Sequence, residues 1–275
     1  MVCVRSPAKL NLCLFVLGKR SDGFHEILSV VQKVELCDLI EIEESYENSV
    51  EFRSHWDIPE DNTVSRTLRY ISGFTGNFYK VRVIKNIPPG AGLGGASSNA
   101  GTVLKKFNIP QMSVIAEKVG SDVPLFLKKT PSLISGRGEI VSEISIEGIN
   151  SAWFLIVFPN ISSITKDVYE KFDSLGISCD TERVSYLRKL VSSGVIKWKD
   201  FEFVLGWNDL EFPFLDLYPE AKSVKDFLSR FAKFHLTGSG SSFFSVFFDK
   251  KEAKRVYDTL RNRFSFLWLV KAFED

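Results

Sequence analysis

A glycine-rich segment holds the residues best suited to chemistry: Pro88-Pro89-Gly90-Ala91-Gly92-Leu93-Gly94-Gly95-Ala96-Ser97-Ser98. Glycine adopts backbone conformations with positive φ and lets backbone N–H groups approach a ligand closely. The segment follows residues 79–84, whose alternating pattern predicts a strand, and it precedes a predicted helix that ends near Lys106. Since the N-terminus of a helix favours an anion, this order predicts a phosphate-binding loop.

The same glycines allow other interpretations. Gly90, Gly92 and Gly95 have the G-x-G-x-x-G spacing of a dinucleotide-binding loop. Such a loop needs its turn directly after the strand and an acidic residue at a strand end ~20 residues later, whereas residues 87–89 intervene here and Glu117 lies in a helical pattern. A P-loop is excluded because no Gly-Lys-Ser/Thr follows. A glycine turn without a ligand stays open as the structural alternative.

The elements that must position this loop mix strands and helices. Strands are predicted at residues 10–17, 27–36 and 39–43, with a polar turn at 18–23. A predicted helix at 61–73 is capped by Asn62 or Thr63 and closed by Gly73. A shorter helix is predicted at 113–119.

A new series of predicted strands and helices begins near residue 150. The later elements are strand 153–158, helices 181–193 and 219–232, a strand from 236 through 248, helix 250–263 and a final strand 264–270. This ending suits an α+β domain. We therefore predict an α+β chain of two domains, residues 1–149 and 150–275.

Composition excludes several classes of protein. Hydrophobic residues make up 44% and charged residues 25% of the 275-residue chain, which suits a buried core and argues against wholesale disorder. A formal charge of +1 gives no electrostatic case for a nucleic-acid partner. The four cysteines form no CxxC pair and the three histidines stand singly, so no metal cluster is expected and the thiols read as free in a reducing compartment.

No segment predicts a membrane anchor. Arg5 and Lys9 precede the apolar run 10–17 as in a signal peptide, but Asn11 interrupts that run and its alternation predicts a strand. The longest other apolar runs, 153–158 and 264–270, fall far short of the ~20 residues of a membrane span. We expect a cytoplasmic protein without a membrane partner.

Three segments together resemble the motifs of the GHMP kinases, the group of galactokinase, homoserine kinase and mevalonate kinase. Ser-Pro-Ala-Lys-Leu-Asn-Leu at 6–12 looks like the first motif, the glycine-rich segment like the phosphate-binding motif, and Leu-Thr-Gly-Ser-Gly at 236–240 like the third. The resemblance implies a two-domain α+β kinase fold with its active site in the cleft between the domains. It also implies ATP as co-substrate and Mg²⁺.

A narrower resemblance covers nearly the whole chain. Residues 7–26, 121–126 (Ser-Asp-Val-Pro-Leu-Phe) and 207–211 (Trp-Asn-Asp-Leu-Glu) are similar in order and spacing to one group of this family. That group phosphorylates the 2-hydroxyl of a cytidine diphosphate-linked methylerythritol in the non-mevalonate (MEP) route to isoprenoid precursors. The resemblance implies a small-molecule substrate, no nucleic acid, and a monomer or weak homodimer.

The resemblance implies a catalytic pair, Lys9 and Asp122. Taken alone, each would be an ordinary surface charge. In the family context Asp122 accepts the proton of the substrate hydroxyl, and Lys9 keeps Asp122 ionised and stabilises negative charge on the attacking oxygen.

The remaining site residues are implied in two sets. Residues 88–98 bind the ATP phosphates, a hydroxyl of Ser97 or Ser98 assists Mg²⁺, and Lys85 and Asn62 match positions near the nucleotide; Asn62 fits a helix cap equally well. Phe24 and Tyr169 match the aromatic pair that stacks on the cytosine, worth ~1–3 kcal/mol per base in nucleic-acid systems. His25 reads the polar edge of the base through a ring nitrogen or its backbone, Asn11 and Thr165 contact the erythritol or phosphate region, and residues 237–242 line the floor.

This chain departs from the family pattern, and other functions stay open. Phe24 stands where relatives usually carry Tyr, and the segment 104–111 is shorter than expected. A GHMP kinase for another alcohol, such as homoserine or a mevalonate-like acid, would want a basic clamp for a carboxylate instead of a stacking slot. An NAD-binding oxidoreductase would use Gly90, Gly92 and Gly95. An RNA-binding module would need a basic surface, against which the balanced charge argues.

Overall fold

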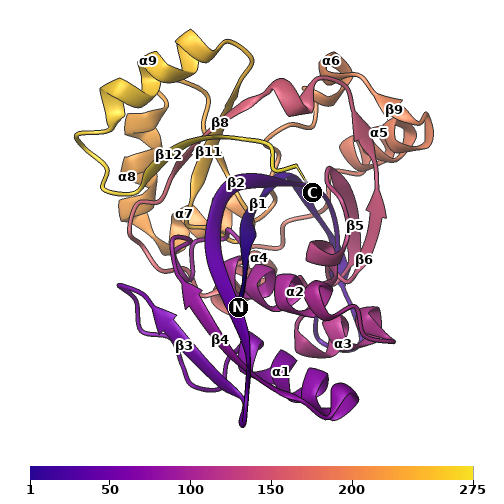
Figure 1. The fold of residues 1–275 in the computed structure, drawn as a ribbon. Coiled ribbons are helices and arrows are strands. Elements are labelled where there is room, and N and C mark those ends of the chain that lie inside the picture. The colour runs from indigo at the N-terminus through magenta and orange to yellow at the C-terminus, as the bar shows by residue number, and fades with distance from the viewer. Residues whose placement is uncertain (275) are drawn as a thin grey trace.

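Two long strands at the start of the chain organise the fold. The computed structural model describes residues 1–274. β1 (Val2–Lys19) and β2 (His25–Ser45) pair in antiparallel register along nearly their whole length. Figure 1 shows β2 as an arc that runs from the lower half of the molecule into the upper half. Residues 6–16 of β1 are all buried, so other elements cover both faces of this strand.

The expectation of two separate strands at 27–36 and 39–43 is wrong, because β2 is continuous. Pro7 pairs with Cys37 but Ala8 pairs with Val34, so β2 holds extra residues opposite this point. Such a bulge interrupts the alternation of apolar residues without ending the strand. The break in the sequence pattern therefore marked a bulge.

The first sheet has six strands. Its order is β3 (Ser49–Arg53), β4 (Phe78–Ile84), β2, β5 (Ser132–Gly136) and β6 (Ile140–Glu143), with β1 paired to β2. α1 (Thr63–Thr75), α2 (Gly95–Phe107) and α3 (Met112–Val119) share a core with β2 and β4, and the 3₁₀ turn Pro124–Leu127 follows α3. These elements bury Ile40, Leu68, Ile71, Val81 and Val103 together.

The second sheet forms the opposite half of the molecule. Its order is β10 (His235–Leu236), β11 (Phe243–Phe247), β8 (Trp153–Val157) and β12 (Leu267–Lys271). One face packs against α4 (Thr165–Ser174), α7 (Glu211–Leu217), α8 (Pro219–Leu228) and α9 (Lys250–Leu260). The other face packs against β1 and against α5 (Thr181–Ser192) and α6 (Trp198–Phe201). Short elements complete this half: β7 (Ser145–Ile146), the 3₁₀ turn Ile149–Ser151 and β9 (Val195–Ile196).

Several predicted boundaries need correction. The strand expected from 236 through 248 is two short strands, β10 and β11, because Gly238 and Gly240 adopt positive φ in a turn between them. α1 continues past Gly73 and ends at Thr75, and the cap residue Gly76 has the left-handed conformation. α8 and α9 end at Leu228 and Leu260, and β12 begins at Leu267, so these elements are shorter than predicted.

The two halves share the first hairpin. Leu14 forms a bridge to Asn208, and Val34 forms a bridge to Ala272. The backbone N–H of Gly206 also donates to the carbonyl of Leu12, with 2.6 Å between N and O. The predicted α+β fold is therefore present, while the division at residues 149 and 150 stays a prediction.

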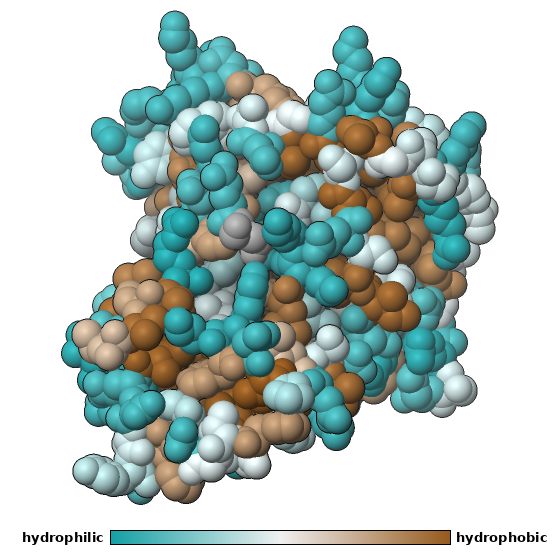
Figure 2. Space-filling view, turned by 45° about the vertical axis from the view of Figure 1, so that its right-hand side comes forward, coloured by the Kyte–Doolittle hydropathy of each residue, from teal (hydrophilic) through white to brown (hydrophobic). Residues whose placement is uncertain are grey.

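The outer surface mixes polar and apolar side chains. On the face drawn in Figure 2, hydrophilic side chains project furthest, and apolar groups lie in separate areas between them. Scattered apolar exposure is ordinary for a folded chain. Over residues 1–274, no helix combines the length and apolar character that crossing a membrane requires.

Candidate active site

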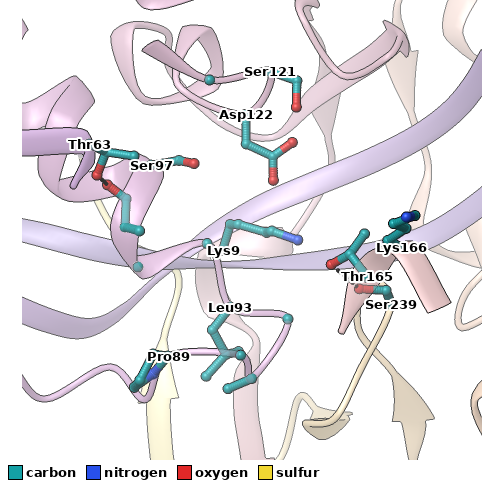
Figure 3. Close-up of a pocket in the computed structure, with 18 of the residues that line it drawn as sticks. Lys9, Thr63, Pro89, Leu93, Ser97, Ser121, Asp122, Thr165, Lys166 and Ser239 are labelled. Atoms are coloured by element: carbon teal, nitrogen blue, oxygen red, sulfur yellow. Dashed lines mark hydrogen bonds between the residues drawn. The ribbon is translucent and has the colours of Figure 1, made fainter. Parts of the chain in front are cut away.

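One cavity collects the residues that the sequence singled out. Its volume is about 810 Å³, and both halves of the molecule line it. Of the residues predicted singly and in the glycine-rich loop, all except Ser98 lie on its wall: Lys9, Asn11, Phe24, His25, Asn62, Lys85, the loop residues 88–97, Asp122, Thr165 and Tyr169. Of residues 237–242, which were expected to line the floor, Gly238 and Ser239 do so. Figure 3 shows Asp122 facing Lys9 across this space, with Ser97 on one side and Thr165 on the other.

The glycine-rich loop needs its glycines for two physical reasons. Gly92 has φ +74°, and a Cβ there would lie 2.4 Å from the carbonyl oxygen of Thr237. Gly94 has φ +70°, and a Cβ there would lie 2.9 Å from Cγ of Lys9. L-residues other than glycine rarely adopt this conformation, and neither site has room for a side chain. The loop therefore lies directly against the third motif and the proposed catalytic lysine.

The loop leads into the N-terminus of α2. Gly94 is the cap residue of this helix and supplies no side-chain hydrogen bond to it, and its first turn holds no acidic residue. The first backbone N–H groups of a helix have no partner within the helix, and the helix dipole favours negative charge there. The start of α2 thus provides an anion-binding position on the cavity wall.

A buried polar network holds the loop from behind. Asp38 is fully buried, and its carboxylate accepts hydrogen bonds from the backbone N–H groups of Asn86 and Ile87, at 2.7 and 2.8 Å. It also accepts from Lys85 Nζ and from Asn99 Nδ2. Burial lowers the pKa of Lys85, and the charge of Asp38 opposes that effect. Lys85 is therefore part of the loop's support as well as a cavity residue.

The two serines at the start of α2 point in different directions. Ser98 is fully buried, and its hydroxyl lies 2.7 Å from the hydroxyl of Ser6. Ser97 lines the cavity. Successive residues of a helix point about 100° apart, so two neighbours can face different surroundings. Of the two serines predicted near Mg²⁺, the geometry places Ser97 at the cavity.

The third motif is fastened to the loop and to the second half of the chain. The backbone N–H of Ser242 donates to the carbonyl of Ala91 at 3.1 Å. Asn208 Nδ2 donates to the carbonyls of Leu236 and Gly238, at 3.1 and 2.8 Å. The hydroxyl of Ser239 lies 2.9 Å from that of Thr165, so the motif also meets the start of α4 (Figure 3). These contacts explain why the 207–211 segment lies beside the site without lining the cavity.

Lys9 is the buried charge at the centre of the site. Its backbone N–H donates to the carbonyl of Leu93 at 2.9 Å, and its Nζ donates to Oδ1 of Asn11 at 2.5 Å. Burial lowers the pKa of Lys9, and the nearby charge of Asp122 opposes that effect. Asp122 follows α3 and is half-buried on the same wall. A buried ammonium that faces a carboxylate across a cavity can stabilise developing negative charge between them.

Asn62 is a helix cap in this structure. Its Oδ1 accepts from the backbone N–H groups of Val64 and Ser65, and Ser65 Oγ accepts from the backbone N–H of Asn62. Its Nδ2 donates to the carbonyls of Pro59 and Glu60. The side chain also lines the cavity, so the helix-cap interpretation is confirmed and contact with a nucleotide stays a prediction. The next residue, Thr63, donates to the carbonyl of Ala96 and ties α1 to the loop.

The predicted aromatic slot has an arrangement that the sequence did not indicate. The ring of His25 stacks on Tyr169, with 4.7 Å between centroids. Phe24 is 53% exposed, and the guanidinium of Arg137 lies 4.9 Å from its ring centroid. Burial raises the pKa of Tyr169, and the charge of Asp122 adds to this. In this structure Tyr169 therefore stacks on His25, and the stacking of Phe24 and Tyr169 on a base stays a prediction.

Sequence reasoning missed several cavity residues. Lys19, Arg137, Lys166 and Asp173 line the wall, and Lys19 lies 2.6 Å from Asp173. Single charged residues are usually solvated surface, so residue type alone does not indicate that these four line a site. Lys19 falls within the 7–26 resemblance, which is the one signal that could have suggested it.

Comparison with known proteins agrees with this geometry. The family described as GHMP kinases N terminal domain matches residues 62–124, and that described as GHMP kinases C terminal matches residues 193–265. The 4-diphosphocytidyl-2-C-methyl-D-erythritol kinase of Thermotoga maritima is 40% identical over 256 residues, which cover 88% of this chain and 90% of the relative. This chain belongs to the family of 4-diphosphocytidyl-2-C-methyl-D-erythritol kinases.

Other members of the kinase family extend the match along the chain. The protein of the same name from Caldanaerobacter subterraneus is 32% identical over 98% of this chain and 96% of its own length. A crystal structure of 4-(cytidine 5'-diphospho)-2C-methyl-D-erythritol kinase has a TM-score of 0.78 and 25% identity, over 99% of this chain and 100% of that one. A homoserine kinase from Cytophaga hutchinsonii shares the fold, with a TM-score of 0.70 and 15% identity over 97% and 95% of the two chains.

Proposed function

We propose that this chain transfers the terminal phosphoryl group of ATP to the 2-hydroxyl of 4-diphosphocytidyl-2-C-methyl-D-erythritol, a step toward isoprenoid precursors. The observation that carries the proposal is one cavity lined by a glycine loop, a buried lysine and a facing carboxylate. Homologues named for this reaction over most of the chain support the same choice. The dinucleotide and RNA-binding alternatives have no comparable support.

The ATP phosphates would lie against the loop 88–97 and the start of α2. The unpartnered N–H groups there match an anion, and Gly92 and Gly94 keep side chains out of the space. The apolar side chains Phe52, Ile58 and Val64 line the cavity near Asn62 and would accommodate the adenine. The loop's support by Asp38 fixes this geometry before ATP arrives.

Asp122 and Lys9 would act on the substrate hydroxyl. Asp122 accepts the proton of the 2-hydroxyl as the oxygen attacks the terminal phosphorus. Lys9 stabilises the negative charge that develops on the oxygens around it. The hydrogen bond to Asn11 positions the ammonium of Lys9. Gly238 leaves room for it, because a Cβ at that position would lie 3.2 Å from Nζ.

Mg²⁺ fits this arrangement through the hydroxyl of Ser97. Mg²⁺ prefers oxygen ligands, keeps several waters and is usually held by substrate phosphates with one or two protein oxygens. Ser97 places an oxygen on the cavity wall beside the predicted phosphate position. When bound there, the ion would neutralise phosphate charge.

A coupled assay tests the proposal. Purified protein is given ATP and Mg²⁺ with and without 4-diphosphocytidyl-2-C-methyl-D-erythritol, and ADP release is measured. We expect strong dependence on that alcohol, and none on homoserine or mevalonate. ATP binding without stimulation by this alcohol would keep the kinase fold and overturn the substrate, whereas NAD binding without ATP binding would overturn the kinase proposal.

A further inference from the structure

Three side chains that line the cavity form a hydrogen-bonded cluster. His25 Nε2 lies 2.7 Å from Oδ1 of Asp173, and Lys19 Nζ lies 2.6 Å from Oδ2 of the same carboxylate. The three come from β1, β2 and α4, and all line the cavity. The side chain of His25 is 8% exposed. None of the site roles described above uses Asp173 or Lys19.

The carboxylate decides which nitrogen of His25 carries the proton. The hydrogen bond from Lys19 lowers the pKa of Asp173, and that from His25 adds to it, so the carboxylate is ionised at neutral pH. An ionised carboxylate only accepts hydrogen bonds. Nε2 of His25 must therefore be the donor, and in a neutral imidazole Nδ1 is then an acceptor.

Neighbouring rings fix the plane of the imidazole. Tyr169 stacks on it at an interplanar angle of 24°, and Phe172 meets it edge-on at 6.2 Å and 88°. With Nε2 held by Asp173 and the ring held by two aromatic neighbours, rotation would break several contacts at once. Among the hydrogen bonds of residues 1–274, none involves Nδ1. This nitrogen is available to a ligand in the cavity.

We propose that Asp173 is a positioning residue that fixes the Nε2–H tautomer of His25, so that Nδ1 accepts a hydrogen bond from an amino group of the bound base and selects cytosine over uracil. The exocyclic N4 group of cytosine donates hydrogen bonds, whereas the 4-position of uracil carries a carbonyl that only accepts. Uracil would therefore place two acceptors together, and a site that loses such a hydrogen bond discriminates strongly. The identity of the base rests on the proposed function, and the tautomer does not.

The first test measures the tautomer directly. ¹⁵N-labelled protein is examined by long-range ¹H–¹⁵N NMR of the histidine rings, and the His25 signals are assigned by their loss in His25→Gln. We expect an Nε2–H imidazole in the wild type and a mixture of tautomers in Asp173→Ala. A proton on Nδ1 in the wild type, or an unchanged spectrum in Asp173→Ala, would overturn the proposal whatever the enzyme's substrate is.

The second test measures base selection. The values of kcat/KM are compared for the cytidine substrate and its uridine analogue. We expect the wild type to prefer cytidine by ~30-fold or more, and Asp173→Ala to lose ~10-fold of that preference, mainly through KM. Asp173→Glu, which retains an acceptor, should recover part of it. An unchanged preference in folded Asp173→Ala would overturn the proposal.

A matched variant controls for simple damage to α4. Asp216→Ala removes the ion pair with Lys171, which joins α4 to α7 at 2.5 Å and lies off the cavity wall. We expect this variant to keep the wild-type base preference. An equal loss of base preference in Asp173→Ala and Asp216→Ala would attribute the effect to α4 and overturn the role of Asp173. If neither substrate is turned over, the proposed function fails while the NMR result still decides the tautomer.

Discussion

At the scale of single residues, the site contains side chains that face the proposed substrate and side chains that support the glycine-rich loop. Lys9 is buried and faces Asp122 across the cavity, whereas Lys85 is buried and paired with Asp38 behind the loop. Both are lysines with a pKa lowered by burial, yet only Lys9 lies opposite the predicted position of the hydroxyl. Residue type alone does not distinguish these two roles, whereas the carboxylate that each lysine faces does.

Asp122→Asn tests the proton acceptor. The amide keeps the shape of the carboxylate but cannot take a proton, so we expect turnover to fall by at least ~100-fold while ATP binding is kept. Single-turnover kinetics and a fluorescent ATP analogue measure the two. Asp167→Asn, a surface residue on α4 away from the cavity, serves as the control. Near-normal turnover would remove Asp122 from its proposed role.

Lys9→Met tests whether activity is maintained at the expense of stability. Because burial lowers the pKa of Lys9 below its ordinary 10.5, the folded chain binds this proton less tightly than the unfolded chain does. Stability therefore rises with pH in the interval below 10.5, as the cost of the buried charge is relieved. At neutral pH we expect the free energy of unfolding of the variant to exceed that of the wild type by ~1 kcal/mol, while its turnover falls. We expect this gap in stability to narrow as the pH rises. Denaturant titrations at several pH values measure this, and a gap that widens with pH would contradict the argument.

Phe24→Ala tests the stacking surface. The ring is half exposed and contacts Arg137, so its loss should leave the fold intact. Stacking on the base is binding energy remote from the phosphoryl group, so we expect KM for the alcohol to rise about 10-fold with a smaller fall in kcat. Steady-state kinetics measure both, with Phe74→Ala, an exposed ring off the cavity, as control. An unchanged KM would place the base elsewhere.

At the scale of elements, the loop depends on a partner in β2. Asp38→Ala leaves the ammonium of Lys85 buried without its carboxylate and removes the acceptor of two backbone N–H groups, those of Asn86 and Ile87, directly before the loop. We expect a loss of ~3–5 kcal/mol in the free energy of unfolding and weaker ATP binding. The double variant Asp38→Ala/Lys85→Met should recover part of the stability but not the ATP affinity. Calorimetry and denaturant unfolding measure these, and a stable single variant would show that the network does not support the loop.

The sequence predicted the helices and strands better than the turns and bulges that connect or interrupt them. The alternating strand at 79–84 and the helix after the glycine loop were placed within a few residues, because each has a clear period and a clear end. The bulge in β2 was missed because it depends on the register of β2 against β1. The turn between β10 and β11 was missed because the apolar residues on either side of Gly238 and Gly240 were taken as one strand. The glycine loop, Lys9 and His25 carried recognisable motifs. Asp38 and Asp173 did not, since their importance comes from partners that only the fold brings near.

At the scale of the whole molecule, the two halves are joined by the first hairpin. The apolar side chains of Leu10, Leu12 and Phe15 belong to the same core as Phe154, Ile156 and Phe244 of the second sheet. We therefore expect residues 1–149 and 150–275 not to fold when expressed separately, and the full chain to unfold in one transition. Circular dichroism and two-dimensional NMR of both fragments measure this. A well-dispersed spectrum from residues 1–149 alone would show that the boundary separates independent domains.

The bridge between Val34 and Ala272 also has a consequence for synthesis on the ribosome. The strand that carries Lys9 is made before β12 and the residues that follow it. At ~5 to 20 residues per second, translation separates the two by roughly 10 to 50 seconds. During that time Val34 of β2, the strand paired with β1, lacks its bridge to Ala272. The hairpin that carries Lys9 therefore gains its last contact with the second half only once residue 272 has been made, and chaperones that shield nascent chains should be needed most by the residues closest to the chemistry.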